Sequence, residues 1–341
     1  MNLLKSVAVS AAAAAVAVSG VANAGTLEDV KAKGFVQCGV STGVPGFAFT
    51  DDKGNWQGFD PAVCQAVAAA VLGDSNKVKY TPTTGKTRFT VLRAGEVDML
   101  ARNTTWTFSR DTDLQLTFVG VNYYDGQGFM VPKSLGVKSA KDLDGASVCI
   151  QTGTTTELNL ADFFRVNGMK YEPVPIETNN EARTNYAAGR CDVYTTDASG
   201  LAATRTTFEN PDDHVVLPEI ISKEPLGPLV RHGDDQWADI VRWVLNAMIN
   251  AEEYGVTSAN VNKHAAAAGN NPEVNRMLGT EGDLGAMIGL DKQWAARAIA
   301  QVGNYGEVFE KFIGKDTPIG LARGLNAQYT DGGLIYAPPM R

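Results

Sequence analysis

Charged and hydroxyl side chains follow three apolar runs of the sequence, and these residues have the chemistry to bind a ligand. The segment 102–106 (Arg-Asn-Thr-Thr-Trp) and then Arg110 follow the run that ends at Ala101. The segment 153–156 (Gly-Thr-Thr-Thr) follows a second run, and Asp197 ends a third. If the runs are strands of an open α/β sheet, these groups lie beyond its carboxyl edge, where such sheets bind ligands.

These polar groups are complementary to a zwitterion. An arginine binds a carboxylate through two parallel hydrogen bonds, and a glycine–threonine run at a helix start offers N–H groups and hydroxyls to an anion. The carboxylate of Asp197 would bind an ammonium group. Each feature alone also has a structural interpretation, namely a surface salt bridge for Arg110 and helix capping for the threonines and Asp197. Their order and spacing together favour an α-amino acid as the ligand.

The remaining reactive residues do not form a catalytic or metal-binding pattern. His214, His232 and His264 fall in segments away from the expected strand ends, so the threonine hydroxyls have no neighbouring base to activate them. The four cysteines form neither a CxxC motif nor a Cys-His cluster. We therefore expect no catalytic residue, no metal and no cofactor.

The first 24 residues have the pattern of a secretory signal peptide. Lys5 precedes an apolar run from Val7 to Val21, and the segment 22–24 (Ala-Asn-Ala) places small residues where signal peptidase reads them. A membrane anchor is the alternative, but the run is alanine-rich and shorter than the roughly 20 apolar residues of a spanning helix. We predict cleavage after Ala24 and export from the cytoplasm.

Charge and length narrow the class of protein further. The 341 residues carry a formal net charge of −8, and 44% of them are hydrophobic. Nucleic-acid binding requires a basic face, so we expect no nucleic-acid partner. The length is typical of about two folded domains.

Export makes disulfide pairing the expected state of the four cysteines. Cys38, Cys64, Cys149 and Cys191 allow three connectivities. Their sequence environments favour Cys38–Cys64 and Cys149–Cys191, because each of these pairs lies inside one candidate domain. In the chain-entropy model each bridge would contribute about 3–4 kcal/mol.

Strands alternate with helices along most of the chain, which is typical of a mostly parallel α/β sheet. The expected strands are 35–40, 78–80, 97–101, 147–151, 172–174 and 191–197. The expected helices are 26–33, 61–71 with Asp60 as N-cap, 89–94, 152–166, 180–188, 236–253, 273–277, 291–304 and 305–313.

An internal similarity indicates two lobes. Residues 92–100 (LRAGEVDML) and 186–194 (YAAGRCDVY) share the order helix end, glycine, charged residue, apolar residue, aspartate, strand. The extended stretches 117–131 and 215–230 flank the second set of elements. Such stretches would be the two crossover strands if one lobe were inserted into the other.

Several of these segments resemble the periplasmic solute-binding proteins of polar amino-acid ABC transporters, and most of all the longer, general L-amino-acid-binding proteins. The matching stretches are 39–74, 92–111, 145–157, 188–203 and the C-terminal 304–339. The resemblance implies an α/β fold of the periplasmic-binding-protein type II kind, with two α/β lobes, a two-strand hinge and a helical C-terminal extension. The implied domains are the signal peptide 1–24, a discontinuous lobe 1 of 25–128 and 222–341, and lobe 2 of 129–221.

The resemblance also implies roles for single residues. Asp197 would hold the ligand's α-ammonium group. The residues that would bind its α-carboxylate are Arg110, Asn103, Thr105, Thr155 and Thr156.

Two positions depart from the family's pattern. Ser41 stands where binders of basic amino acids have an aspartate, and Val44 stands where many members have a stacking aromatic residue. These departures speak against selectivity for lysine or arginine and favour a broad range of amino acids. Phe47, Arg88 and Trp106 are the further candidates to line the side-chain pocket.

The function implied by the resemblance is the binding component of an ABC importer. A monomer would close its two lobes over an L-amino acid and deliver it to permease subunits of the inner membrane, which work with a cytoplasmic ATPase. The alternative is a periplasmic cyclohexadienyl dehydratase on the same fold, acting on prephenate or arogenate, which would need a general acid in the cleft. A secreted structural or adhesion domain would not need convergent groups for a zwitterion.

Overall fold

The computed structural model describes residues 25–341. The predicted signal peptide and its cleavage site, residues 1–24, lie outside the described residues. Within residues 25–341, no helix has both the length and the apolar character that crossing a membrane requires.

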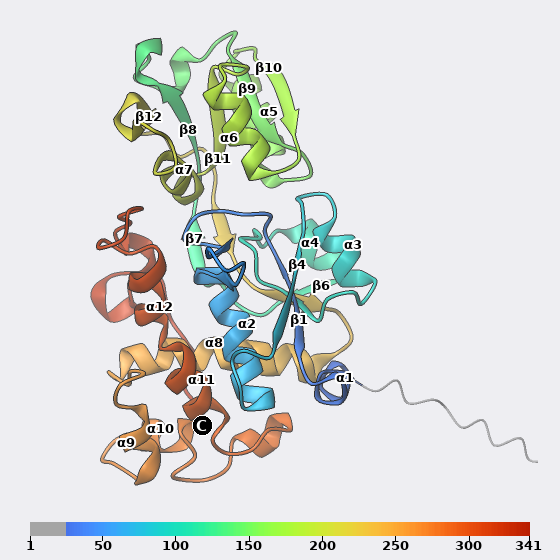
Figure 1. Cartoon of the computed structure of the whole chain (residues 1–341), viewed down its shortest axis with the longest axis vertical. Helices are drawn as coiled ribbons and strands as arrows, with labels where there is room; N and C mark the ends of the chain where they lie inside the picture. The colour runs from blue at the N-terminus through green and yellow to red at the C-terminus, as the bar shows by residue number, and fades with distance from the viewer. Residues whose placement is uncertain (1–24) are drawn as a thin grey trace, which may run out of the picture.

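Two five-stranded sheets organise the chain into two bodies (Figure 1). The first sheet has the order β4-β1-β5-β14-β6. Its strands are β1 (Val36–Val40), β4 (Val78–Pro82), β5 (Met99–Leu100), β6 (Leu116–Phe118) and β14 (Leu229–Arg231). Strand β1 pairs in parallel with β4 and β5, whereas β14 runs antiparallel to β5 and β6. We call the body built on this sheet, residues 25–122 and 227–341, the lower lobe.

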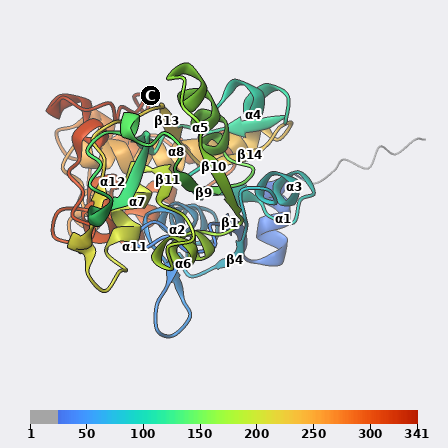
Figure 2. The same ribbon diagram turned by 90° about the horizontal axis from the view of Figure 1, so that it is seen from above.

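The second sheet has the order β10-β9-β11-β8-β12. Its strands are β8 (Gln127–Pro132), β9 (Ser147–Gln151), β10 (Glu172–Ile176), β11 (Val193–Asp197) and β12 (His214–Val216). We call the body built on it, residues 127–221, the upper lobe. Seen from above, the upper lobe lies over the lower one (Figure 2).

A two-stranded antiparallel ribbon joins the lobes. It consists of β7 (Tyr123–Asp125) and β13 (Glu224–Leu226), with Glu224 opposite Asp125 in the register. Both strands fall within the extended stretches predicted to cross between the lobes. Strand β8 begins at Gln127, two residues before the predicted boundary of lobe 2.

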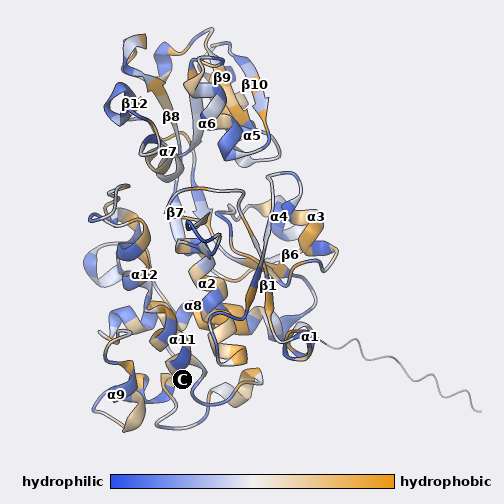
Figure 3. Ribbon diagram, viewed as in Figure 1, coloured by the Kyte–Doolittle hydropathy of each residue, from blue (hydrophilic) through white to orange (hydrophobic). Residues whose placement is uncertain are grey.

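Helices cover both sheets, and the strands of both sheets carry many apolar residues whereas the helices mix apolar and polar ones (Figure 3). The upper lobe has α5 (Thr155–Val166), α6 (Asn179–Ala187) and α7 (Ala198–Arg205). The lower lobe has α1 (Thr26–Lys33), α2 (Phe59–Leu72), α3 (Arg88–Arg93), α4 (Phe108–Thr112), α8 (Asp235–Glu253), α9 (Val261–Ala266), α10 (Pro272–Met277), α11 (Trp294–Val302) and α12 (Tyr305–Phe312), with the β2–β3 hairpin (Phe49–Thr50, Trp56–Gln57).

Two helix starts differ from the prediction because glycines redirect the backbone. Helix α2 begins at Phe59 with Gly58 as N-cap, so the prediction that Asp60 caps the helix is wrong; Asp60 lies buried in the first turn. A Cβ at Gly58 would lie 2.5 Å from the carbonyl oxygen of Phe47, and the glycine has φ +132°. Helix α5 begins at Thr155 rather than residue 152, because Gly153 has φ +73° and Thr154 then caps the helix.

Both predicted disulfides are confirmed. Cys38–Cys64 joins β1 to α2 in the lower lobe, and Cys149–Cys191 joins β9 to the residues before β11 in the upper lobe. Each bridge therefore crosslinks a strand to its own lobe, and neither restrains the lobes relative to each other.

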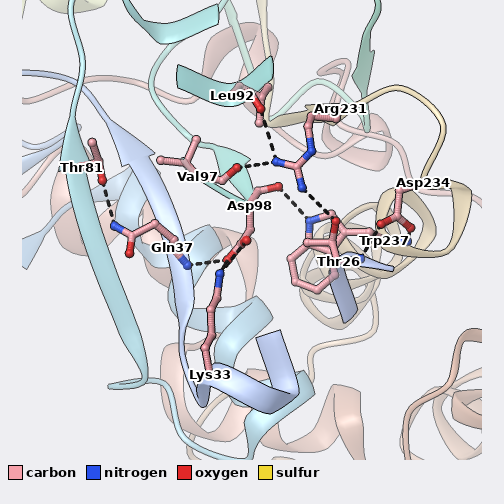
Figure 4. Close-up of polar contacts among 10 residues, drawn as sticks. All are labelled: Thr26, Lys33, Gln37, Thr81, Leu92, Val97, Asp98, Arg231, Asp234 and Trp237. Carbon is pink, nitrogen blue, oxygen red and sulfur yellow. Dashed lines mark hydrogen bonds and ion pairs between the residues drawn. The ribbon is translucent and has the colours of Figure 1, made fainter. Parts of the chain in front are cut away.

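A polar network fixes the start of the described chain on the lower lobe (Figure 4). The carboxylate of Asp234 accepts a hydrogen bond from the backbone N–H of Thr26 at 2.7 Å, and the guanidinium of Arg231 donates to the Thr26 hydroxyl at 3.0 Å. Lys33, at the end of α1, forms an ion pair with the buried Asp98 at 2.6 Å. The N-terminal helix is thereby tied to the sheet at both of its ends.

The C-terminal extension reaches the ribbon that joins the lobes. The buried side chain of Asn326 accepts a hydrogen bond from the backbone N–H of Tyr124 at 2.6 Å and donates to its carbonyl oxygen at 3.1 Å. The hydroxyl of Tyr305 donates to the carbonyl of Asn122 at 2.9 Å. Asn326 thus completes the free edge of β7 as a neighbouring strand would.

The replacement Asn326→Ala removes both of these bonds to β7. We expect the free energy of unfolding to fall by about 1–3 kcal/mol, because polar groups of the ribbon lose their partner. Thermal or urea denaturation monitored by circular dichroism measures the change. Asn167→Ala is the matched control, since the Asn167 side chain makes one exposed bond, to the carbonyl of Phe163. Equal effects of the two replacements would contradict the role of Asn326.

Candidate functional site

Most of the predicted binding residues meet in a small cavity between the lobes. The cavity has a volume of about 20 Å³ and lies beyond the carboxyl ends of β5, β9 and β11. Its lining residues are Arg88, Arg102, Asn103 and Thr105 from the lower lobe and Gln151, Thr154, Thr155, Thr156, Thr196 and Asp197 from the upper lobe. The lobes are in contact here, so groups from both can bind one ligand.

Three buried arginines give the lower side of the cavity a positive charge. Arg88 is the first residue of α3, Arg102 follows β5, and Arg110 lies in α4. Arg110 donates to the carbonyl of Thr105 at 2.8 Å, and Arg88 donates to the hydroxyl of Thr104 at 3.3 Å. The buried Nε atoms of Arg88 and Arg102 have no hydrogen-bond partner among residues 25–341.

Burial weakens the hold of these arginines on their protons. It lowers the pKa of Arg102 to about 10 and that of Arg110 to about 10. Burial and the repulsion of Arg102 and Arg110 lower the pKa of Arg88 well below its ordinary value. An anion placed among these groups would be stabilised by all three charges and would supply the missing hydrogen-bond acceptors.

A cluster of buried carboxyl groups lies on the opposite side. Asp197 ends β11 and occupies the N-cap position of α7, yet its side chain makes no capping hydrogen bond. Burial and the repulsion of Asp125 and Glu224 raise the pKa of Asp197 well above its ordinary value. Burial likewise raises the pKa of Asp125 to about 6, although the hydroxyl and backbone N–H of Ser199 donate to it. A cation beside Asp197 would lower its pKa and offset this cost.

A fourth buried carboxyl group, that of Asp60, lies within electrostatic reach of Arg102. Asp60 is buried in the first turn of α2, and its Oδ2 has no hydrogen-bond partner within residues 25–341. Burial raises the pKa of Asp60 to about 7, against the attraction of Arg102. Asp60 therefore sits close to the positive side of the cavity without neutralising it through a direct ion pair.

Glu224, on the joining ribbon, is a site residue that sequence reasoning missed. Its buried carboxylate accepts four hydrogen bonds, from Thr105 Oγ1 at 2.5 Å, Thr155 Oγ1 at 3.0 Å, Asn159 Nδ2 at 2.7 Å and Ser222 Oγ at 2.6 Å. The only signal in the sequence was a glutamate inside a stretch expected to be an extended crossover strand.

These bonds change what the two threonine hydroxyls can offer a ligand. A hydroxyl has one proton to donate and two lone pairs that accept. For both Thr105 and Thr155, the bond to Glu224 is shorter than the 3.3 Å between the two hydroxyls themselves. With their protons directed to Glu224, these oxygens face a ligand as acceptors rather than as the carboxylate donors expected from the sequence.

The two remaining predicted carboxylate-binding residues also border the cavity. Asn103 adopts φ +40°, and its buried Oδ1 has no partner within the described chain. Thr156 lies in the first turn of α5, where its carbonyl accepts from the side chain of Gln127 at 3.2 Å. Both positions suit contact with a ligand.

Three predicted side-chain-pocket residues are not part of this cavity lining. Ser41 follows β1 and is fully buried, with its hydroxyl unpartnered within residues 25–341. Phe47 packs edge-on against Phe59 in the aromatic core of the lower lobe. Trp106 stacks on Phe118 at 5.5 Å between ring centroids and is 39% exposed.

A second, larger cleft of about 300 Å³ also has walls from both lobes. Its lower wall comes from the segment around the β2–β3 hairpin and its upper wall from α6 and α7. The lining residues are Thr42, Gly43, Pro45, Phe49, Thr50, Trp56, Asn179, Asn180, Arg183, Thr204 and Thr207.

Residues 25–341 contain no cluster of three or more histidine, cysteine, aspartate or glutamate side chains suited to hold a metal ion.

Comparison with known proteins gives this geometry its context. Residues 36–260 match the model of the bacterial extracellular solute-binding proteins, family 3. The glutamate/glutamine/aspartate/asparagine-binding protein BztA of Rhodobacter capsulatus is 64% identical over 337 residues, 99% of each chain. The general L-amino acid-binding periplasmic protein AapJ of Rhizobium johnstonii is 59% identical and covers 100% of this chain and 99% of its own.

A solved structure agrees with the fold over nearly the whole chain. The ABC transporter periplasmic binding protein from Brucella ovis, with glutathione bound, superposes with a TM-score of 0.90 at 58% identity, covering 93% of this chain and 100% of that one. These relatives are described as binding proteins, which confirms the predicted non-enzymatic binding role and disfavours the dehydratase alternative. The match over most of the chain and the shared two-lobed fold show that this chain belongs to the bacterial extracellular solute-binding proteins of family 3.

Proposed function

We propose that this protein captures L-amino acids at the polar residues between its lobes and delivers them to an ABC importer. The cavity of about 20 Å³ is smaller than an amino acid, so the lobes must separate to admit one. The observation that carries the proposal is the separation of charge at one site: buried Arg88 and Arg102 line the cavity together with buried Asp197, and buried Arg110 lies beside it. Each set is destabilised by its own burial, and a zwitterion offsets both costs at once.

The charges define how the amino acid is oriented. The α-carboxylate lies toward Arg110 and the start of α5, where backbone N–H groups at a helix N-terminus favour an anion. The α-ammonium group lies toward Asp197, with the hydroxyl oxygens of Thr105 and Thr155 available as further acceptors. Arg110 and Asp197 are therefore the two residues on which binding depends most.

The ligand's side chain extends toward Arg88 and Arg102. Both carry buried Nε donors that have no partner within the part of the chain that the structure describes, and these donors would suit a carboxylate or an amide oxygen. The names of the relatives point the same way, since BztA is described as binding glutamate, glutamine, aspartate and asparagine. AapJ is described as a general L-amino acid binder, so we propose a broad range with a preference for acidic and amide side chains.

The proposed partners and compartment follow from this role. The exported protein, cleaved after Ala24, works as a monomer in the periplasm and passes its ligand to permease subunits coupled to a cytoplasmic ATPase. The proposed moving parts are the lower lobe and the upper lobe, whose predicted counterparts are residues 25–128 with 222–341 and residues 129–221. Closure about β7 and β13 encloses the ligand, and the permease recognises the closed form.

A second candidate ligand is glutathione. The Brucella ovis neighbour was solved with glutathione bound, and the second, larger cleft of about 300 Å³, which also has walls from both lobes, is a separate space that could receive part of such a ligand. Calorimetric titration with the twenty L-amino acids and with glutathione separates the two cases. Mass spectrometry of ligands released on denaturation identifies what the purified protein already holds. Absence of binding to every one of these compounds would refute the proposal.

Replacing Arg110 by alanine leaves the ligand carboxylate without its main cation. We expect the affinity for the preferred amino acid to fall about 30-fold or more, because truncating one partner of a buried charge pair costs about 2–5 kcal/mol. Isothermal titration calorimetry measures the loss. Arg165→Ala is the matched control, since Arg165 pairs only with the exposed Asp162 on the same helix. Unchanged affinity in Arg110→Ala would remove this residue from the site.

Binding should release protons near pH 6. In the free protein the raised pKa values of Asp125 and Asp197 keep protons on these carboxyl groups, whereas an ammonium group beside Asp197 lowers their pKa in the complex. The complex then holds fewer protons than the free protein, so the affinity rises as the pH rises from about 5 to 7. Calorimetry at pH 6 in two buffers of different ionisation enthalpy counts the released protons. An affinity that stays constant over this range, with no proton release, would contradict the proposed contact with Asp197.

A further inference from the structure

The polar contacts of Glu224 reach three parts of the molecule. Thr105 belongs to the lower lobe, Thr155 and Asn159 belong to α5 of the upper lobe, and Ser222 belongs to the chain that enters the ribbon. One carboxylate therefore receives donors from both lobes and from the segment between them. The four donor–acceptor distances run from 2.5 to 3.0 Å, and the bond from Thr105 is the shortest.

Local backbone pairing holds Glu224 in place beside the lower lobe. Thr105 forms an isolated antiparallel bridge with Leu226, and the N–H of Trp106 donates to the carbonyl of Pro225 at 2.8 Å. On the other side of β13, Glu224 lies opposite Asp125 of β7. The contacts to the lower lobe are thus held by short-range pairing, whereas those to α5 require the upper lobe to be close.

The other charged contact between the lobes differs from Glu224 in burial. Lys86 and Glu177 form an ion pair at 3.2 Å, but their side chains are 53% and 61% exposed. Exposed ion pairs contribute about 0–1 kcal/mol. Glu224 is 1% exposed, and a buried carboxylate that loses its donors costs far more than an exposed one. Of these two charged contacts, the one made by Glu224 therefore favours the closed arrangement over separated lobes more strongly.

We propose that Glu224 is a positioning residue for ligand binding, which joins the lobes in the closed arrangement and directs the Thr105 and Thr155 hydroxyls so that their lone pairs face the ligand. Opening the lobes withdraws Thr155 and Asn159 and leaves the carboxylate with the donors of Thr105 and Ser222 only. Closure restores all four bonds and places the two hydroxyl oxygens at the cavity. The orientation of the hydroxyls toward a ligand rests on the proposed amino-acid binding, whereas the joining of the two lobes by Glu224 does not.

The test compares Glu224→Gln with the wild-type protein. The amide keeps the shape of the side chain but replaces one acceptor oxygen by a donor NH₂, which cannot accept the hydroxyl or amide protons that the carboxylate accepts. We expect a ligand-free protein with a larger radius of gyration in small-angle X-ray scattering. For the preferred amino acid we expect at least a tenfold loss of affinity, seen mainly as faster dissociation in stopped-flow measurements.

Glu219→Gln is the matched control. Glu219 also accepts a hydroxyl proton, from Ser139 at 2.6 Å, and a backbone N–H, from Ala140 at 3.0 Å, but all these residues lie in the upper lobe. Its replacement should leave both the scattering and the dissociation rate unchanged. A Glu224→Gln protein that matches the wild type in both measurements would overturn the proposal.

A second variant covers the case in which Glu224→Gln does not fold. Thr155→Val removes the upper-lobe hydroxyl and keeps its shape, so it should also enlarge the ligand-free protein. An unchanged radius of gyration in that variant would refute the joining role. The two proposals can fail separately. If the wild type binds no amino acid but the Glu224 or Thr155 variant has a larger radius of gyration than the wild type, the proposed function fails and the joining role of Glu224 stands.

Discussion

Buried charge between the lobes is the constraint on which the rest of this structure depends. Arginines and carboxyl groups are held out of water on facing sides of one cavity, where isolated charges are costly. Backbone and hydroxyl contacts satisfy part of their hydrogen-bonding capacity, and two arginine Nε atoms stay unpartnered within residues 25–341. If the proposed function holds, the site is thereby prepared for a molecule that carries both charges, and its specificity for a zwitterion arises from a cost already present in the free protein.

The fold brings these charges together through its sheet topology. Parallel strands place their carboxyl ends on one edge, so Arg102 after β5 and Asp197 at the end of β11 point into the same space once the sheets face each other. The disulfides stiffen each lobe separately and leave the ribbon of β7 and β13 as the connection. Glu224 lies on that ribbon, so the element that permits movement also carries a residue that binds both moving parts.

Much of this arrangement could be predicted from local patterns in the sequence. Strand β9 and helix α1 have the predicted bounds, because apolar runs and capping glycines mark them locally. Five of the predicted α-carboxylate and α-ammonium residues line the cavity, since strand-end positions are visible in the sequence. Arg110 lies beside it and bonds to Thr105. The helix start at Phe59 was missed because it depends on a close approach of Gly58 to Phe47, which are far enough apart in sequence to give no local signal.

Other parts required three-dimensional knowledge. Glu224 looked like an ordinary polar residue of an extended strand, because its four donors come from positions between 2 and 119 residues away. Phe47 and Trp106 were expected to line the side-chain pocket, but neither lines the small cavity. Phe47 packs against Phe59 and Trp106 stacks on Phe118, and the sequence alone does not show these contacts. The direction in which the Thr105 and Thr155 hydroxyls point their protons is likewise set by Glu224, which is distant in sequence.

The anchoring of both ends of the described chain, residues 25–341, on the lower lobe has a consequence for attaching a label to either of them. Thr26 is bound to Asp234 near α8, and Arg341 pairs with Glu273 of α10 at 3.1 Å (Figure 1). A tether, tag or fluorescent domain fused to either end is therefore attached to the lower lobe and makes no direct connection to the upper lobe. Two fluorophores fused to the two ends would keep a nearly constant separation while the lobes move. A sensor of ligand capture must instead carry one of its reporters on an exposed loop of the upper lobe, which the chain enters and leaves only through the ribbon.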